Sequence, residues 1–129
     1  MFYSTGTLKY FANPYKLIVQ VDQGISDFYR SLIPKAQYVQ RQMYAAHISV
    51  VRKELPPKME LWGKHQNRKI VFEYDYMIYN NETYYWLNAY AKELEEVRLE
   101  LGLQICSPWT RSPDGKHRFH ITIGNIKNV

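Results

Sequence analysis

The sequence has little cysteine and no long apolar run. Cys106 is the only cysteine among 129 residues. A single thiol forms no internal disulfide, and it removes any zinc site built from several cysteines. No stretch approaches the roughly 18 apolar residues of a membrane-spanning helix, and residues 1–10 lack the charged-then-apolar order of a signal peptide. We therefore expect a protein of the reducing cytoplasm that has no membrane partner.

Long linkers and low-complexity tracts are also missing. The six glycines and six prolines are scattered, and no block of like charge divides the chain. The 46% of hydrophobic and 22% of charged residues match one compact domain. A chain of this length buries roughly two-thirds of its unfolded surface. Residues 1–129 are therefore expected to form a single domain without disulfide or metal staples.

Positive charge and tyrosine are what the sequence has in quantity. Lys and Arg number 17 against 12 Asp and Glu, a net charge of +5, and there are 12 tyrosines. A positive field attracts phosphate groups. Aromatic rings stack on bases, although most of them fill the core. Charge alone does not choose between nucleic acid, a small nucleotide and no ligand.

Hydrophobic periodicity predicts strands separated by helices. Helical spacing runs from Ile25 to Leu32, after a capping Asp22, and again from Tyr90 to Leu101. A short helix is expected at 59–62. Alternation or apolar runs predict strands at 5–10, 15–21, 44–51, 69–79, 83–88 and 118–123. Strand runs with two or three helices on one side predict an α+β domain of mainly antiparallel sheet.

Two tetrapeptides repeat one pattern: His47-Ile48-Ser49-Val50 and His120-Ile121-Thr122-Ile123. Successive side chains of a strand point to opposite faces, so each histidine projects beside a hydroxyl while the apolar residues face the other way. If the two strands lie side by side, two imidazoles and two hydroxyls converge on a rigid sheet.

Such a set suits the cleavage of a phosphodiester. Histidine titrates near pH 6.5, so one of a facing pair can accept a proton from the attacking hydroxyl while the other protonates the leaving oxygen. Serine and threonine hydroxyls can donate to phosphate oxygens, where charge develops in the transition state. This chemistry needs no metal and no cofactor. One copy alone usually has a structural role, and the matched second copy favours catalysis.

The paired His-x-Ser/Thr-x motifs resemble those of the 2H phosphoesterase superfamily, whose members act on 2′,3′-cyclic phosphates, 2′,5′-linked oligonucleotides or cyclic nucleotides. Residues 4–8, 28–34 and 120–125 are similar to the phage branch called Swiss-army-knife RNA-repair-like. That branch includes anti-CBASS nucleases, which destroy the cyclic oligonucleotide signal of bacterial immunity. The resemblance implies two pseudo-symmetric lobes of mainly antiparallel sheet, with helices on the outer side and a central groove.

The resemblance also implies roles for four residues. His47 and His120 would be the acid/base pair, and Ser49 and Thr122 would hold the phosphate. Ser49 stands where Thr is commoner in the family, and it keeps the hydroxyl. The implied activity is a metal-independent phosphodiesterase that hydrolyses cyclic di- or trinucleotides, used by a phage for immune evasion in the host cytoplasm.

Two other functions remain open. One is a 2′,3′-cyclic phosphodiesterase that processes RNA ends with the same four residues. The other is a non-catalytic nucleotide-binding sponge. The intact histidine and hydroxyl pairs argue against the sponge, because binding alone needs no facing acid and base.

Three more residues are candidate substrate contacts. Arg118 lies two residues before His120, on the same strand face, where its guanidinium can grip a phosphate or remain a surface charge. Trp109 lies in the loop 109–116, which suits a lid over the ligand, and Tyr10 closes a predicted strand. Either ring can stack on a base or simply pack against the domain.

A zinc site is not expected. His117 and His120 are three residues apart, so in an extended chain their rings point to opposite faces. No cysteine or acidic cluster completes a ligand set.

Overall fold

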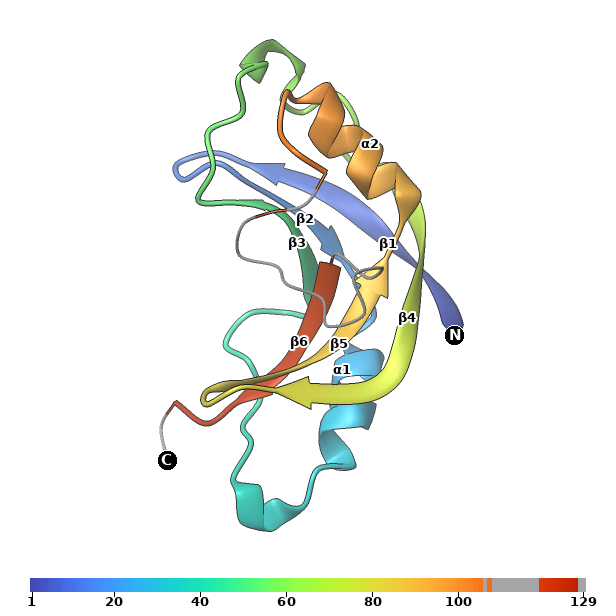
Figure 1. The fold of residues 1–129 in the computed structure, drawn as a ribbon, viewed down its shortest axis with the longest axis vertical. Coiled ribbons are helices and arrows are strands. Elements are labelled where there is room, and N and C mark those ends of the chain that lie inside the picture. Colours follow the sequence, from blue (N-terminus) through green and yellow to red (C-terminus); the bar gives the residue numbers. More distant parts are fainter. Residues whose placement is uncertain (106, 108–118, 128–129) are drawn as a thin grey trace.

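The computed structural model describes residues 1–105, 107 and 119–127. Within these ranges, six strands close into one antiparallel barrel (Figure 1). Around the barrel the strand order is β1-β2-β3-β6-β5-β4. The strands are β1 (Phe2–Phe11), β2 (Lys16–Gln20), β3 (His47–Arg52), β4 (Lys69–Asn80), β5 (Tyr84–Tyr90) and β6 (Phe119–Asn125). The helices are α1 (Gln23–Ser31) and α2 (Lys92–Glu100), with 3₁₀ turns η1 (Lys35–Gln37) and η2 (Met59–Leu61).

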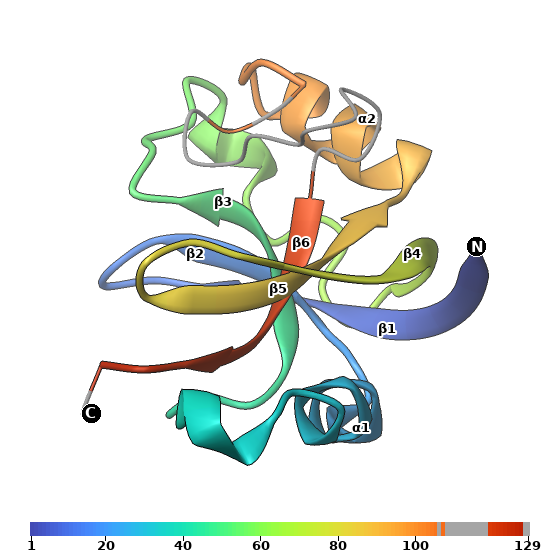
Figure 2. The same cartoon turned by 60° about the horizontal axis from the view of Figure 1, so that its bottom comes forward.

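The predicted division into two pseudo-symmetric lobes flanking a groove is wrong. Strand β1 is long enough to pair with two neighbours: residues 2–7 pair with β4, and residues 7–11 pair with β2. This one strand joins the two ends of the sheet and closes it. The placement of the helices also differs from the prediction, because α1 and α2 cover opposite ends of the barrel (Figure 2). Both motifs therefore belong to a single barrel.

Alternating apolar side chains fill the barrel. Those that face inward from the strands are almost completely buried and include Leu8, Leu17, Val19, Ile48, Val50, Ile70, Phe72, Leu87, Phe119, Ile121 and Ile123. Leu94, Val97 and Leu101 of the α2 region join the same core, as does Tyr29 of α1. The inner face of each strand is occupied by the core, so the polar residues between these positions lie on the outer face.

The predicted helices and strands are confirmed, with shifted ends. Helix α1 begins after Asp22, whose carboxylate accepts a hydrogen bond from the Gly24 amide at 2.9 Å, as a capping residue does. The second helix begins at Lys92, because Tyr90 still belongs to β5. The strand expected at 44–51 begins only at His47. Residues 44–46 are thereby left outside the sheet.

A buried ion pair ties α2 to β3. Arg98 is 0% exposed, and its guanidinium donates two hydrogen bonds of 2.9 Å to the Glu54 carboxylate. It also donates to the backbone carbonyls of Val50 at 2.7 Å and Gln104 at 2.8 Å. These hydrogen bonds offset the free-energy cost of burying the charged Arg98 guanidinium away from water. Arg98 therefore anchors the strand that carries the first motif.

Replacing Arg98 with methionine is expected to lower the free energy of unfolding by about 3–5 kcal/mol, because the Glu54 carboxylate, which is only 14% exposed, loses its partner. Urea unfolding followed by circular dichroism measures this change. The control is Lys64→Met, which removes a more exposed ion pair with Glu100 and should cost less than about 1 kcal/mol. Equal losses in both variants would contradict the anchoring role.

Candidate active site

The two motif strands are neighbours in the barrel. Strands β3 and β6 pair antiparallel, with the central isoleucines of the two motifs opposite each other. One residue to either side, this register places His47 opposite Thr122 and Ser49 opposite His120. Opposed residues of such a pair have Cβ atoms about 5 Å apart, and diagonal neighbours such as the two histidines lie about 7–8 Å apart. Each imidazole therefore lies beside the hydroxyl of the other motif.

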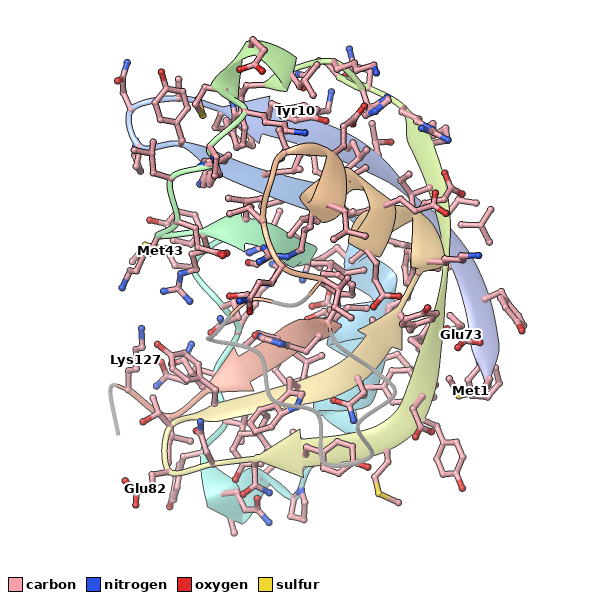
Figure 3. All side chains as sticks on the ribbon, turned by 45° about the horizontal axis from the view of Figure 1, so that its top comes forward. Met1, Tyr10, Met43, Glu73, Glu82 and Lys127 are labelled. Carbon is pink, nitrogen blue, oxygen red and sulfur yellow. The ribbon has the colours of Figure 1, made fainter. Side chains whose placement is uncertain are left out.

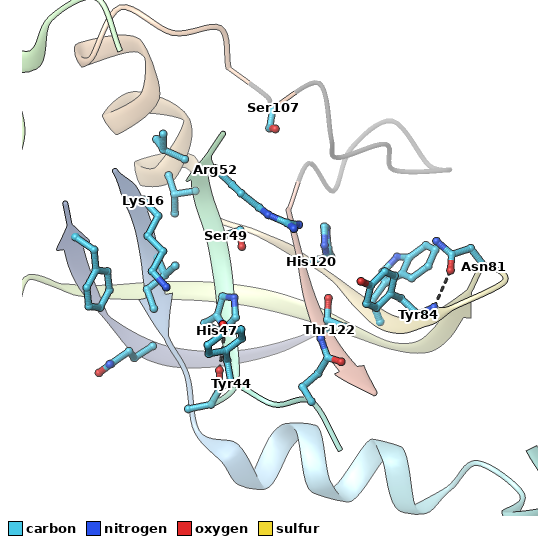
Figure 4. A pocket seen from close by; sticks show the side chains of 18 of the residues that line it. Lys16, Tyr44, His47, Ser49, Arg52, Asn81, Tyr84, Ser107, His120 and Thr122 are labelled. Carbon is cyan, nitrogen blue, oxygen red and sulfur yellow. Dashed lines mark hydrogen bonds between the residues drawn. The ribbon is translucent and has the colours of Figure 1, made fainter. Parts of the chain in front are cut away.

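All four side chains line one pocket on the outer face of the sheet (Figure 4). The isoleucines and valine that alternate with them are at most 1% exposed, so strand geometry directs the histidines and hydroxyls outward. The pocket has a volume of about 790 Å³, which lies within the range of small-molecule sites. The structure thus brings together His47, Ser49, His120 and Thr122, as the side-by-side arrangement of their strands requires.

Aromatic rings and cations surround these four residues. The rings belong to Phe11, Tyr44, Tyr84 and Trp86, and the cations to Lys16, Arg52 and Lys127. Sequence patterns did not predict any of these residues as part of the site. Alternation places Lys16 and Trp86 on the outer face of their strands, but only the pairing of β2 with β3 and of β5 with β6 brings them to the motifs.

The connection before β3 carries Tyr44 to the edge of the pocket. It is bound to the end of β6: Gln40 donates to the Asn125 carbonyl at 2.8 Å and accepts from the Asn125 amide at 3.0 Å. Gly124 permits this close approach, because a Cβ there would lie 2.8 Å from the Gln40 carbonyl oxygen. The Asn125 side-chain amide also donates to Gln42. The second motif's strand thus helps to build the wall beside the first motif.

His47 has a defined hydrogen-bond pattern. Its Nδ1 lies 2.8 Å from the carbonyl oxygen of Ala45. A carbonyl oxygen only accepts, so Nδ1 carries a hydrogen whichever the charge of the ring. Nε2 is therefore the ring nitrogen of His47 that is available for proton exchange.

His120 has an unusually low pKa. Its pKa is lowered to about 4, mainly by burial and in smaller part by the positive charges of His47 and Arg52. The Trp86 ring contributes to its surroundings, with ring centroids 6.2 Å apart. His120 is consequently neutral at pH 7, which is the state that accepts a proton.

The other sequence-predicted contacts are not gathered here. Tyr10 is not among the described residues that line the pocket, although its neighbour Phe11 is. Alternation puts Tyr10 on the same face of β1 as the buried Leu8, and it packs against the core. Its ring packs edge-on against Trp62, with centroids 5.1 Å apart, which favours the packing role. Arg118, Trp109 and the loop 109–116 lie outside the described residues.

Figure 3 shows the side chains of the described residues as sticks on the ribbon. Within the described part of the chain, no group of three His, Cys, Asp or Glu side chains is arranged to hold a metal ion. No helix in these same ranges has the length and apolar character needed to cross a membrane.

Compared with known protein families, curated proteins and solved structures, the chain shows no significant match to any of them. The geometry of the pocket, together with the motifs, therefore carries the functional inference.

Proposed function

We propose that the chain is a metal-independent phosphodiesterase that cleaves cyclic oligonucleotides by proton transfer between two histidines. The observation that carries this proposal is the register of β3 and β6, which sets each imidazole beside the hydroxyl of the other motif in one pocket. A facing acid and base serve bond cleavage and add nothing to simple binding. This geometry favours an enzyme over a nucleotide-binding sponge.

His120 is the base and His47 the acid in this mechanism. Neutral His120 removes the proton from a ribose 2′-hydroxyl while the 2′-oxygen forms a bond to phosphorus. The bond from phosphorus to the 5′-oxygen breaks, and Nε2 of protonated His47 gives that oxygen its proton. The products are a 2′,3′-cyclic phosphate and a 5′-hydroxyl, with one proton gained by His120 and one lost by His47.

The hydroxyls of Ser49 and Thr122 complete the site. Each lies opposite the histidine of the other motif, where it can donate to a non-bridging phosphate oxygen. Negative charge grows on these oxygens in the transition state, so donors aimed at them accelerate the reaction. Arg52 lines the same pocket and adds positive charge. By the resemblance of residues 4–8, 28–34 and 120–125 to the phage branch, this activity would serve a phage that removes an immune messenger of its host.

A panel of substrates tests the proposal. The purified protein is incubated with cyclic di- and trinucleotides and with RNA bearing 2′,3′-cyclic phosphate ends, and the products are resolved by mass spectrometry. We expect the cyclic nucleotides to be opened, and the rate to survive excess EDTA, because side chains supply the acid and base. The variant lacking both motif histidines is the control.

Three results of this panel would contradict the proposal. Cleavage of the RNA ends alone would assign the chain to RNA processing. Tight binding without cleavage would assign it to the sponge. Activity that EDTA abolishes and zinc or manganese restores would overturn the metal-independent mechanism.

The rate should depend on pH through His120. Because the pKa of His120 is lowered to about 4, the acidic limb of kcat/KM is expected near pH 4, well below the usual histidine range. Arg52→Gln removes one of the charges that lower this pKa, so it should move the acidic limb to higher pH. Lys58→Gln, at an exposed position away from the pocket lining, is the control. An acidic limb near pH 6.5 in the unmodified protein would contradict the assignment of His120 as the base.

A further inference from the structure

Each side of the histidine pair carries a tyrosine ring with a lysine ammonium over it. On the β2 side, Lys16 Nζ lies 5.4 Å from the centroid of the Tyr44 ring and 5.0 Å from that of Phe11. On the β5 side, Lys127 Nζ lies 4.9 Å from the centroid of the Tyr84 ring. All of these residues line the same pocket as the two motifs.

The two lysine–tyrosine pairs flank the motifs from opposite directions. Figure 4 shows Lys16 on the side of His47 away from Thr122, Tyr44 overlapping His47 in this view, and Tyr84 on the opposite side, beyond Thr122. Tyr84 is also opposite Asn125 of β6, the strand that carries the second motif. Each motif strand thus has its own aromatic ring and its own cation. This arrangement matches a ligand that repeats the same chemistry on both sides of the histidines.

A nucleotide has the chemistry that fits one such pair. Tyr44 is 68% exposed, so its ring is available to a flat partner. Stacking of a base on an aromatic ring is stronger than an exposed contact between an ammonium and a ring. A base that covers the tyrosine therefore displaces the lysine, and the released ammonium can pair with a phosphate.

We propose that the pocket binds a dinucleotide unit, with one nucleobase on Tyr44, one on Tyr84, and the phosphodiester that joins them between the two histidines. This inference rests on the proposed function and names the substrate class of that same site. A nucleoside 2′,3′-cyclic phosphate has a single base and fills only one subsite. A linkage inside a cyclic oligonucleotide has a base on each side and fills both.

Binding of ligands that cannot be cleaved tests the two subsites. Isothermal titration compares a 2′-O-methyl cyclic dinucleotide with a 2′-O-methyl nucleoside 3′-monophosphate. The dinucleotide should bind at least roughly ten-fold more tightly, since it stacks a second base. Tyr44→Leu and Tyr84→Leu should each weaken dinucleotide binding by roughly 5- to 100-fold, while Tyr44→Phe and Tyr84→Phe keep the ring and the affinity.

The matched control is Tyr76→Leu, an exposed tyrosine of β4 that is not among the described residues lining the pocket. It should leave the affinity unchanged within about two-fold, as a surface residue without a ligand contact does. Unchanged affinity in either pocket leucine variant, or equal affinity for the two ligands, would overturn the two-base inference.

A parallel cleavage assay with the ribose form of the dinucleotide separates this inference from the proposed function. Two-base binding without any cleavage would overturn the proposed function and support the subsites. If both leucine variants cleave at the full rate and bind the dinucleotide with full affinity, the proposed function is supported and the two base subsites are overturned.

Discussion

Alanine at His120 or at His47 is expected to lower the rate of cleavage by roughly 10²- to 10⁴-fold, the usual contribution of a positioned acid or base. In the proposed mechanism, alanine at His120 removes the base, which is neutral at pH 7 and takes the 2′-proton. Alanine at His47 removes the proposed acid, whose Nε2 would protonate the leaving oxygen. Single-turnover cleavage of a cyclic dinucleotide, followed by chromatography, measures both losses.

Variants of the two motif hydroxyls, and of a histidine outside the pocket as a control, extend the comparison of cleavage rates. Ser49→Ala and Thr122→Ala should each lower the rate by roughly 10- to 10³-fold, because one transition-state donor is lost. His65 hydrogen-bonds to Glu100 at 2.9 Å and is not among the described residues that line the pocket. His65→Ala should therefore cleave at the normal rate. A normal rate in either motif-histidine variant would contradict the mechanism.

Removing the 2′-hydroxyl of the substrate is expected to stop cleavage, because that hydroxyl is the nucleophile of the proposed mechanism. The motif hydroxyls of Ser49 and Thr122 are assigned to the phosphate, and a ribose 2′-oxygen beside a 3′,5′-phosphodiester is already in place for attack. A 2′-deoxy or 2′-O-methyl cyclic dinucleotide should bind with modestly altered affinity and remain intact. The natural substrate should pass through a 2′,3′-cyclic phosphate that mass spectrometry detects.

A mixed substrate provides an internal control for this prediction. A cyclic dinucleotide with one ribose and one 2′-deoxyribose should open only at the linkage that follows the ribose. Opening of both linkages at similar rates would mean that water is the nucleophile, with His120 activating that water instead of the 2′-hydroxyl.

Local patterns in the sequence were enough to find the elements and the four residues of the motifs. Helical spacing located α1 and α2, and a capping carboxylate at Asp22 marked where the first begins. Strand alternation put each motif histidine on the same face as its hydroxyl. These inferences hold because periodicity depends only on the geometry of the backbone over a few residues.

The architecture could not be read in this way. The ten residues of β1 look like any other strand, and nothing local reveals that its two halves pair with different neighbours and close the barrel. The expectation of two lobes failed at this point. Tyr10 was selected as a base contact for its aromatic ring at the end of a predicted strand, but the closed barrel turns that ring towards the core and Trp62.

Composition and spacing therefore determined which groups this protein can use: two histidines, two hydroxyls and an excess of positive charge. The tertiary structure decided how those groups meet. The antiparallel register of β3 and β6 set each imidazole beside the other motif's hydroxyl, and enclosure of His120 near His47 and Arg52 lowered its pKa. Pairing of β2 and β5 beside the motif strands brought Lys16 and Tyr84 to the pocket. Contacts between residues far apart in the chain depend on long-range strand pairing and burial, which no short window of sequence contains.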